Sequence, residues 1–172
     1  MMSTSKTYDL NINAAAYALK SVVLKTPLQY HRKLSEKFNA EIYLKREDLQ
    51  VVRSYKLRGA YNMMSSLTAD ELKNGVVCAS AGNQAQGFAF SCKKLGVKGV
   101  VFMPIITPNQ KVNQTRMFGE EFVEVVLTGD TFDDCAIAAR EYTEANNMVF
   151  IPPFEDARII EGQGTVAVGI AE

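Results

Sequence analysis

The sequence predicts an α/β fold built on a parallel, doubly wound sheet, and three observations predict it. Short runs rich in β-branched residues alternate with segments of helical pattern. Those segments open on capping residues or close on glycines, as helices do. The chain has 172 residues, 47% of them hydrophobic, which is enough for about one domain with a proper core.

The first part of the chain, residues 1–53, is expected to form the N-terminal segment of a large domain. It carries a helical stretch, a turn at the TPL sequence of residues 26–28, a second helix and a strand at residues 41–45. The second helix is polar, so its His31 is expected on a solvated face rather than in a catalytic triad.

The middle of the chain, residues 54–154, is expected to form a small α/β domain with a four-stranded parallel sheet. Strand, helix and strand in repetition are typical of such sheets. The strands are the runs at residues 76–80, 99–104, 122–127 and 148–152. The helix signals between them are a capping box at Thr68 to Glu71, stops at Gly75, Gly96 and Gly119, a cap at Thr107-Pro108, and a cap at Thr131.

The end of the chain, residues 155–172, is expected to begin the return into the large domain. Its sequence predicts a helix from Asp156, a pause at Gly162-Gln163-Gly164, and a second helix from Thr165. That second helix is short and lacks a stop signal, so we expect a truncated element.

Composition excludes several classes of protein. The 19 Lys and Arg residues balance the 19 Asp and Glu residues, so no net field attracts nucleic acid or an anionic membrane. Three cysteines, Cys78, Cys92 and Cys135, fit a reducing compartment and small core positions. No apolar run reaches the length of a membrane span and no secretory signal opens the chain, so we expect a cytoplasmic protein. With one histidine, the sequence predicts no metal site.

The first segment that carries chemistry is SYKLRGA, which follows KREDLQ. Lys56 lies there among cations such as Arg53 and Arg58, at the start of a helix expected to run to about Leu67. Nearby positive charge and partial burial favour a neutral amine, which a lysine needs in order to bond to a carbonyl carbon. A basic run around a loop is also typical of a solvated face, and the residues alone leave both interpretations open.

The second segment is SAGNQAQG, which leaves the strand at residues 76–80 and enters a helix. Small residues there let a ligand approach the backbone, and the amides of a helix start favour an anion. Asn83 adds a side chain that can both donate and accept hydrogen bonds. A plain strand-to-helix turn with Asn83 as a cap is the alternative.

These segments carry a resemblance. SYKLRGA, SAGNQAQG and PFEDARIIEGQGT, in this order, resemble the lysine, asparagine-loop and GQGT motifs of fold-type II pyridoxal-phosphate enzymes. KREDLQVVRSYKLRGAYNMM and ASAGNQAQGFAFSCKKLGVKGVVFMP are similar to the threonine dehydratases of isoleucine biosynthesis. The resemblance runs from about Thr26 to Val168. It implies a fold-type II architecture, with the parallel small domain and the first part of a second α/β domain.

The resemblance also implies a reaction and the residues that perform it. The reaction is the pyridoxal-phosphate-dependent dehydration and deamination of L-threonine to 2-oxobutanoate and ammonia, by a lyase that is a homo-oligomer. Lys56 resembles the lysine that bonds to the cofactor and later takes the α-proton. Tyr55 and Asn83 resemble the residues that contact the cofactor ring. The substrate carboxylate is implied to bind the loop of Ser80, Ala81, Gly82, Asn83 and Gln84.

Three departures from the family pattern qualify this expectation. Gln84 replaces the usual histidine, Gly169 replaces a common glutamate, and no tetraglycine-like phosphate loop occurs in the sequence. We therefore expect the 172-residue chain by itself to bind the cofactor weakly and to turn over threonine poorly. The alternatives are a related enzyme acting on serine, such as a dehydratase or racemase, threonine synthase, and a non-catalytic fragment. A nucleotide-binding domain is disfavoured because no G-x-G-x-x-G follows the first strand.

Overall fold

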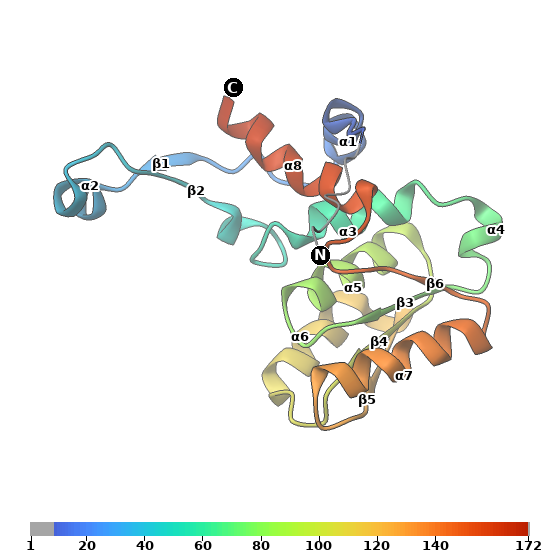
Figure 1. Ribbon diagram of the computed structural model, residues 1–172. Helices are drawn as coiled ribbons and strands as arrows, with labels where there is room; N and C mark the ends of the chain where they lie inside the picture. The colour runs from blue at the N-terminus through green and yellow to red at the C-terminus, as the bar shows by residue number, and fades with distance from the viewer. Residues whose placement is uncertain (1–8, 172) are drawn as a thin grey trace, which may run out of the picture.

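The computed structural model describes residues 9–171, and its body is a four-stranded parallel sheet between two layers of helices (Figure 1). The strands pair in the order β5–β4–β3–β6. They are β3 (Val76–Ala79), β4 (Gly99–Met103), β5 (Val123–Leu127) and β6 (Val149–Phe150). The α/β fold with a parallel, doubly wound sheet is therefore confirmed.

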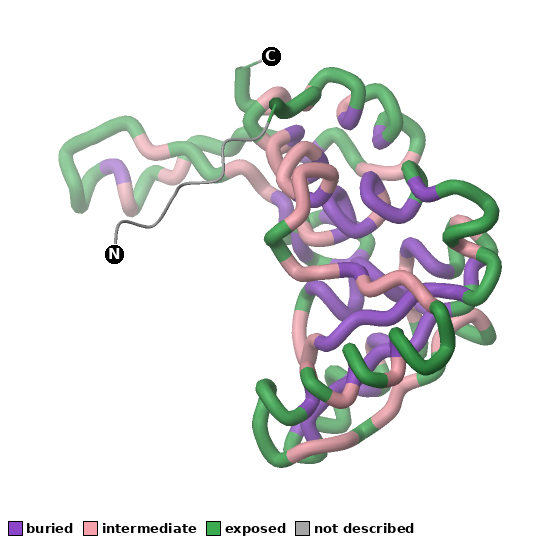
Figure 2. The backbone as a smooth tube through the Cα atoms, turned by 45° about the vertical axis from the view of Figure 1, so that its right-hand side comes forward, coloured by how far each residue is buried: buried purple, intermediate pink, exposed green. Residues whose placement is uncertain are grey.

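Side chains along the central strands alternate between two apolar cores, because successive residues of a strand face opposite sides of the sheet. Val76 and Cys78 join the core that holds Phe88, whereas Val77 and Ala79 join the core that holds Ala139. The first core is covered by α5 (Asn83–Leu95) and α6 (Asn109–Gly119), and the second by α7 (Phe132–Ala145). β3 and β4 are buried along their whole length, whereas β5 and β6 are only partly buried, and Figure 2 shows buried stretches through the middle of the body. All three cysteines are buried and free, as predicted.

Most of the predicted helix ends are present. Thr68 and Glu71 form the capping box that opens α4 (Ala69–Leu72), and Thr131 forms one with Asp134 at the start of α7. Gly96 ends α5 in the left-handed conformation, with φ 68°. The cap predicted at Thr107 is wrong. Pro108 takes the N-cap position of α6 without a side-chain bond, and the Thr107 hydroxyl is buried without a partner.

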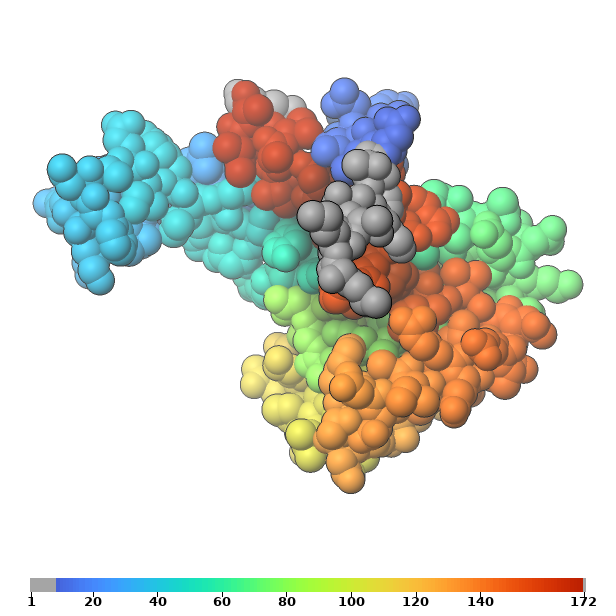
Figure 3. Space-filling view, viewed as in Figure 1, coloured from blue at the N-terminus to red at the C-terminus, as the bar shows by residue number. Residues whose placement is uncertain are grey.

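The N-terminal part of the chain contains an antiparallel ribbon that extends from the body (Figures 1 and 3). The turn predicted at residues 26–28 is wrong, because Leu28 begins a strand that pairs with Lys45. His31 is not on a solvated helix face. It is the half-buried N-cap of a helix, where its Nδ1 accepts a hydrogen bond from the Leu34 N–H. The elements are α1 (Ile12–Leu19), β1 (Leu28–Tyr30), α2 (Arg32–Phe38), β2 (Tyr43–Lys45) and the 3₁₀ helix η1 (Glu47–Leu49).

The predicted pause at residues 162–164 is also wrong, because the tail forms one helix, α8 (Ala157–Ala171). It packs on α3 (Lys56–Ser65). A Cβ at Gly162 would lie 2.5 Å from the Arg58 carbonyl oxygen, so this glycine permits close helix contact instead of breaking the helix. The remaining 3₁₀ helix, η2 (Glu120–Phe122), leads into β5. Within residues 9–171, no helix is long and apolar enough to cross a membrane.

Candidate active site

The strand order of the sheet changes direction beside β3. The chain passes from β3 to β4 and β5 on one side, and then returns to place β6 on the other side of β3. The two strands are in register at Val77 and Phe150, and the Ile151 N–H donates to the Val77 carbonyl at 2.8 Å. Open α/β sheets bind ligands at the carboxyl ends of the strands that flank such a reversal. Residues 80–84 follow β3 at this edge, and Pro152 and Pro153 follow β6.

Lys56 is brought to this edge by a tight turn. The Arg53 N–H donates to the Gln50 carbonyl at 2.8 Å, and Arg53 has φ 60°, a conformation that favours glycine. Three residues after Arg53, Lys56 is the first residue of α3. Its Nζ donates to the Pro153 carbonyl oxygen at 2.8 Å, which places the amine beside the end of β6.

Burial shifts the pKa of the Lys56 amine. Lys56 is half-buried, and burial lowers the pKa of its amine below the ordinary value. The Nζ atom lies 5.8 Å from the centre of the Tyr55 ring. The expected contribution from neighbouring cations is not found at Arg58, whose guanidinium is engaged by Glu47. Partial burial is therefore the cause of the lowered pKa of Lys56.

Gly87 sets the distance between α3 and α5. A Cβ at Gly87 would lie 2.8 Å from the Leu57 nitrogen and 2.9 Å from the Lys56 carbonyl carbon. Backbone atoms cannot rotate away as the end of a long side chain can, so only glycine fits here without a shift. The start of α3 is thereby held directly against α5.

The loop of residues 80–84 presents backbone amides at the start of α5. The Ser80 hydroxyl accepts a hydrogen bond from the Gly82 N–H at 3.2 Å. Gly82 is the N-cap and supplies no side-chain bond, so the alternative in which Asn83 caps the helix is wrong. Asn83 is the exposed first residue of α5, and Ala81 is half-buried. Uncapped amides at the start of a helix are suited to a carboxylate or phosphate.

Gln84 links this loop to Lys56. Its Nε2 donates to the Pro152 carbonyl at 3.3 Å, one residue before the carbonyl that holds the Lys56 amine. Among the described residues, no hydrogen bond joins Lys56 directly to residues 80–84. The structure thus brings together Lys56, Tyr55 and Gln84, with Ser80 and Gly82 at the neighbouring strand end.

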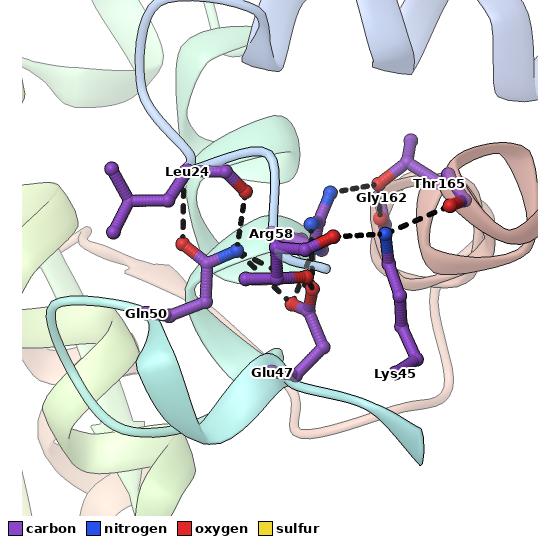
Figure 4. Close-up of polar contacts among 9 residues, drawn as sticks. Leu24, Lys45, Glu47, Gln50, Arg58, Gly162 and Thr165 are labelled. Carbon is purple, nitrogen blue, oxygen red and sulfur yellow. Dashed lines mark hydrogen bonds and ion pairs between the residues drawn. The ribbon is translucent and has the colours of Figure 1, made fainter. Parts of the chain in front are cut away.

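A buried ion-pair cluster surrounds Arg58 in the first turn of α3 (Figure 4). Arg58 donates to Glu47, and Thr26 donates to the same carboxylate at 2.6 Å. Arg58 also donates to the Thr165 hydroxyl at 3.0 Å, and Lys45 donates to the Gly169 carbonyl at 2.8 Å. Burial acts to raise the pKa of Glu47, but hydrogen bonds from Arg58 and Thr26 and the Arg58 charge leave that pKa lowered. The cluster fixes Arg58, two residues beyond Lys56.

Buried polar atoms without partners gather in the three sequence motifs. The atoms of this kind among the described residues are the Ser54 hydroxyl, the Gln84 Oε1, the Thr107 hydroxyl and both amide atoms of Gln163. All but Thr107 belong to SYKLRGA, SAGNQAQG or GQGT. Unpaired buried groups are costly, and in native proteins they concentrate where a polar ligand or water binds.

The groups gathered at this site match one part of pyridoxal phosphate. A half-buried amine, an aromatic neighbour and free helix-start amides suit its aldehyde carbon, its ring and a substrate carboxylate. The phosphate group is not matched in the same way, because no two glycines are adjacent anywhere in the sequence.

Sequence reasoning missed two groups of the site. Pro152 and Pro153 act through carbonyl oxygens, and only the rule that parallel strands end at one edge could have indicated them. Gln163 lies over α3, where a Cβ at Gly59 would meet its Nε2 at 2.5 Å. Its place within the GQGT motif was the available signal.

Comparisons with known proteins show which proteins this chain is similar to. The chain is 58% identical over 152 residues to the biosynthetic L-threonine dehydratase of Bacillus subtilis, which covers 88% of the chain and 36% of that protein. A threonine deaminase structure from Solanum lycopersicum superposes with TM-score 0.85 at 40% identity, covering 98% of this chain and 47% of that one. A serine racemase from Dictyostelium discoideum gives TM-score 0.83 at 31% identity, covering 92% of this chain and 51% of that one. The chain therefore spans about a third to a half of the length of these relatives.

A family model described as "Pyridoxal-phosphate dependent enzyme" matches residues 19–172, which is most of the chain. The match includes the turn that delivers Lys56, the loop of residues 80–84 and helix α8. The chain belongs to the pyridoxal-phosphate dependent enzyme family.

Proposed function

We propose that this protein acts in the pyridoxal-phosphate-dependent dehydration and deamination of L-threonine, with Lys56 as the lysine that bonds to the cofactor. The observation that carries the proposal is the position of the Lys56 amine. It is half-buried, its pKa is lowered by burial, and it lies at the reversal of strand order beside the start of α5. The name of the Bacillus subtilis relative supports threonine as the substrate.

Each site residue has a role that follows from its chemistry. When bound, the cofactor supplies an electron sink for the α-carbon of the substrate. In its neutral form, which partial burial favours by lowering the pKa, the Lys56 amine accepts the α-proton. The Tyr55 ring would pack beside the cofactor ring, and Asn83 would offer its amide to the polar edge of that ring. The substrate carboxylate is held by the amides of the loop, whose members are Ser80, Ala81, Gly82, Asn83 and Gln84.

Loss of the β-hydroxyl requires the substrate to be oriented before the proton moves. Holding the carboxylate at the start of α5 would fix one end of the substrate, and the Lys56 amine would accept the proton from its α-carbon. Orientation of this kind is a large part of what a protein adds to cofactor chemistry. The products are 2-oxobutanoate, ammonia and regenerated amine.

A racemase acting on serine is the second candidate, and the serine racemase structure is the observation that favours it. The higher identity to a threonine dehydratase places it second. Assembly as a homo-oligomer and a cytoplasmic location stay predictions, as do the absence of a nucleic-acid or membrane partner and the division at residues 53 and 154.

The first test is covalent labelling by the cofactor. The purified chain is mixed with pyridoxal phosphate, reduced with borohydride, digested and analysed by mass spectrometry. We expect the reduced pyridoxyl group on Lys56, and its loss in Lys56→Ala. Lys111→Ala, an exposed lysine on α6, serves as the matched control.

The second test is product formation from L-threonine and L-serine, measured as 2-oxo acid and as D-serine. We expect slow, Lys56-dependent release of 2-oxobutanoate, because the sequence offers no glycine-rich phosphate loop. Labelling spread evenly over surface lysines would contradict the role of Lys56. D-serine in place of 2-oxobutanoate would favour the racemase.

A further inference from the structure

Two side chains hold two consecutive carbonyls after β6. The Lys56 Nζ donates to Pro153 at 2.8 Å, and the Gln84 Nε2 donates to Pro152 at 3.3 Å. The ring of each proline fixes φ, so the dipeptide is stiffer than an ordinary loop. Between the two carbonyls only ψ of Pro153 is free to rotate, so a displacement of one carbonyl shifts the position of the other.

The buried position of the Gln84 amide is energetically unfavourable. Gln84 is 3% exposed, and its Oε1 has no hydrogen-bond partner. A buried acceptor without a partner is unfavourable by about 1–3 kcal/mol. An apolar side chain of the same length would avoid that penalty, but it could not donate to Pro152.

The backbone of Gln84 lies in the first turn of α5, and Gln84 is the last residue of the loop proposed to hold the substrate carboxylate. Its side chain crosses to the end of β6. One residue therefore joins the carboxylate loop to the segment that docks the Lys56 amine.

We propose that Gln84 is a positioning residue for Lys56: by fixing the Pro152 carbonyl, it holds the Pro153 carbonyl in place as the acceptor for the Lys56 amine. The proposal rests on the function proposed above, since it assigns Lys56 a working amine. It adds a specific coupling between the loop of residues 80–84 and that amine.

The coupling has a measurable consequence in the chain without cofactor. A carbonyl acceptor stabilises the ammonium form and slows attack by the amine on an electrophile. Loss of the Gln84 donor should free the dipeptide and weaken that acceptor. The Lys56 amine should then react faster, and its titration midpoint should move to lower pH.

The experiment is quantitative acetylation by acetic anhydride across a range of alkaline pH, read by mass spectrometry of the Lys56 peptide. The variant Gln84→Met lacks the donor. We expect Lys56 to react about three- to tenfold faster in it, in line with the weakening of one hydrogen bond to a charged group. Gln84→His retains an N–H donor and should stay close to the wild-type rate.

Gln86→Met is the matched control. Gln86 is buried on the same helix and donates to Gln114 at 3.0 Å, away from Lys56. It should leave the Lys56 rate unchanged. Exposed lysines in the same digest correct for any general change in reactivity, and circular dichroism verifies that each variant is folded.

An unchanged Lys56 rate in a folded variant without the donor would overturn the proposal, as would an equal increase in Gln86→Met. Because no pyridoxal phosphate is present, failure of cofactor binding does not affect this measurement. Conversely, cofactor labelling of Lys56 together with an unchanged acetylation rate would preserve the proposed function and remove only the role of Gln84.

Discussion

Arg58 and Glu47 form a two-pronged ion pair, with 2.8 Å between Nε and Oε2 and 2.9 Å between Nη2 and Oε1. Both side chains are less than a tenth exposed. Arg58 reaches onward to Thr165 and Glu47 to Thr26, so the pair joins the N-terminal segment to α3 and α8. Such a pair needs further hydrogen bonds to offset the loss of water, and these partners supply them.

Replacing Glu47 by Gln should destabilise the protein strongly. The variant would leave the Arg58 guanidinium buried without a counter-charge, which typically costs about 3–5 kcal/mol of unfolding free energy. Urea denaturation measures the loss. Asp48→Asn is the control at the next position, because Asp48 pairs with Arg46 at the surface. Equal losses in the two variants would contradict a special role for the buried pair.

The same pair should contribute to acid sensitivity. Burial opposes ionisation of Glu47, but the bonds from Arg58 and Thr26 leave its pKa lower in the folded chain than the ordinary 4.5. The unfolded chain therefore takes up this proton first as the pH falls. The contribution is complete above the unfolded pKa and is lost as the pH falls through the folded pKa. The stability difference between wild type and Glu47→Gln should shrink over that acidic window, and a constant difference would be inconsistent with this account.

Replacing Gly87 by Ala should disturb the start of α3. The new Cβ would meet backbone atoms of Lys56 and Leu57, and crowding of this kind typically costs about 1–3 kcal/mol. Thermal and urea unfolding measure the loss, and cofactor labelling of Lys56 should fall with it. Gly82→Ala is the stability control, because its Cβ would meet nothing within 4 Å. A loss in Gly82→Ala as large as in Gly87→Ala would count against the contact.

Two glycines of α8 should respond differently to alanine. At Gly162 a Cβ would lie 2.5 Å from the Arg58 carbonyl oxygen, so Gly162→Ala should separate α8 from α3 and lower stability. At Gly164 the obstacle is the terminal methyl of Ile12, 2.9 Å away, which can rotate. Alanine also favours the helix over glycine by about 1 kcal/mol, so Gly164→Ala should be near neutral. Urea midpoints compare the two, and the reverse order would refute the packing argument.

The cysteines should be inert in the folded protein. Burial raises the pKa of the Cys78, Cys92 and Cys135 thiols, and thiolates are the reactive form. A thiol reagent at neutral pH should modify all three only after denaturation. Rapid modification of any of them in the folded chain would show that its part of the core opens readily.

Most of the body could be predicted because its signals are local. The strands that begin at Val76 and Gly99 are short apolar runs. The capping boxes at Thr68 and Thr131 each span only four residues at the start of a helix. Helix α8 could not be predicted in one piece. Its glycines weaken a helix considered alone, and the reason they are tolerated is the contact with α3.

The residues of the candidate site could be named from the sequence only where a side chain carries the signal. Lys56 and the loop of residues 80–84 are found from side chains in a recognisable order. The carbonyls of Pro152 and Pro153 are not, because every residue carries a carbonyl and only the fold selects these two. The orphaned amide of Gln84 is likewise a property of packing rather than of sequence.

The glycine contacts of α3 have a consequence for motion. Helix α3 meets α5 at Gly87 and α8 at Gly162, and both contacts are backbone against backbone. It cannot slide or tilt without separating from one of them, so fraying of α3 alone is suppressed. Its amide protons should exchange with solvent only through a concerted opening of all three helices. Lys56 thus lies on a helix that is held by backbone contacts on two sides, and its freedom of movement lies in its own side chain.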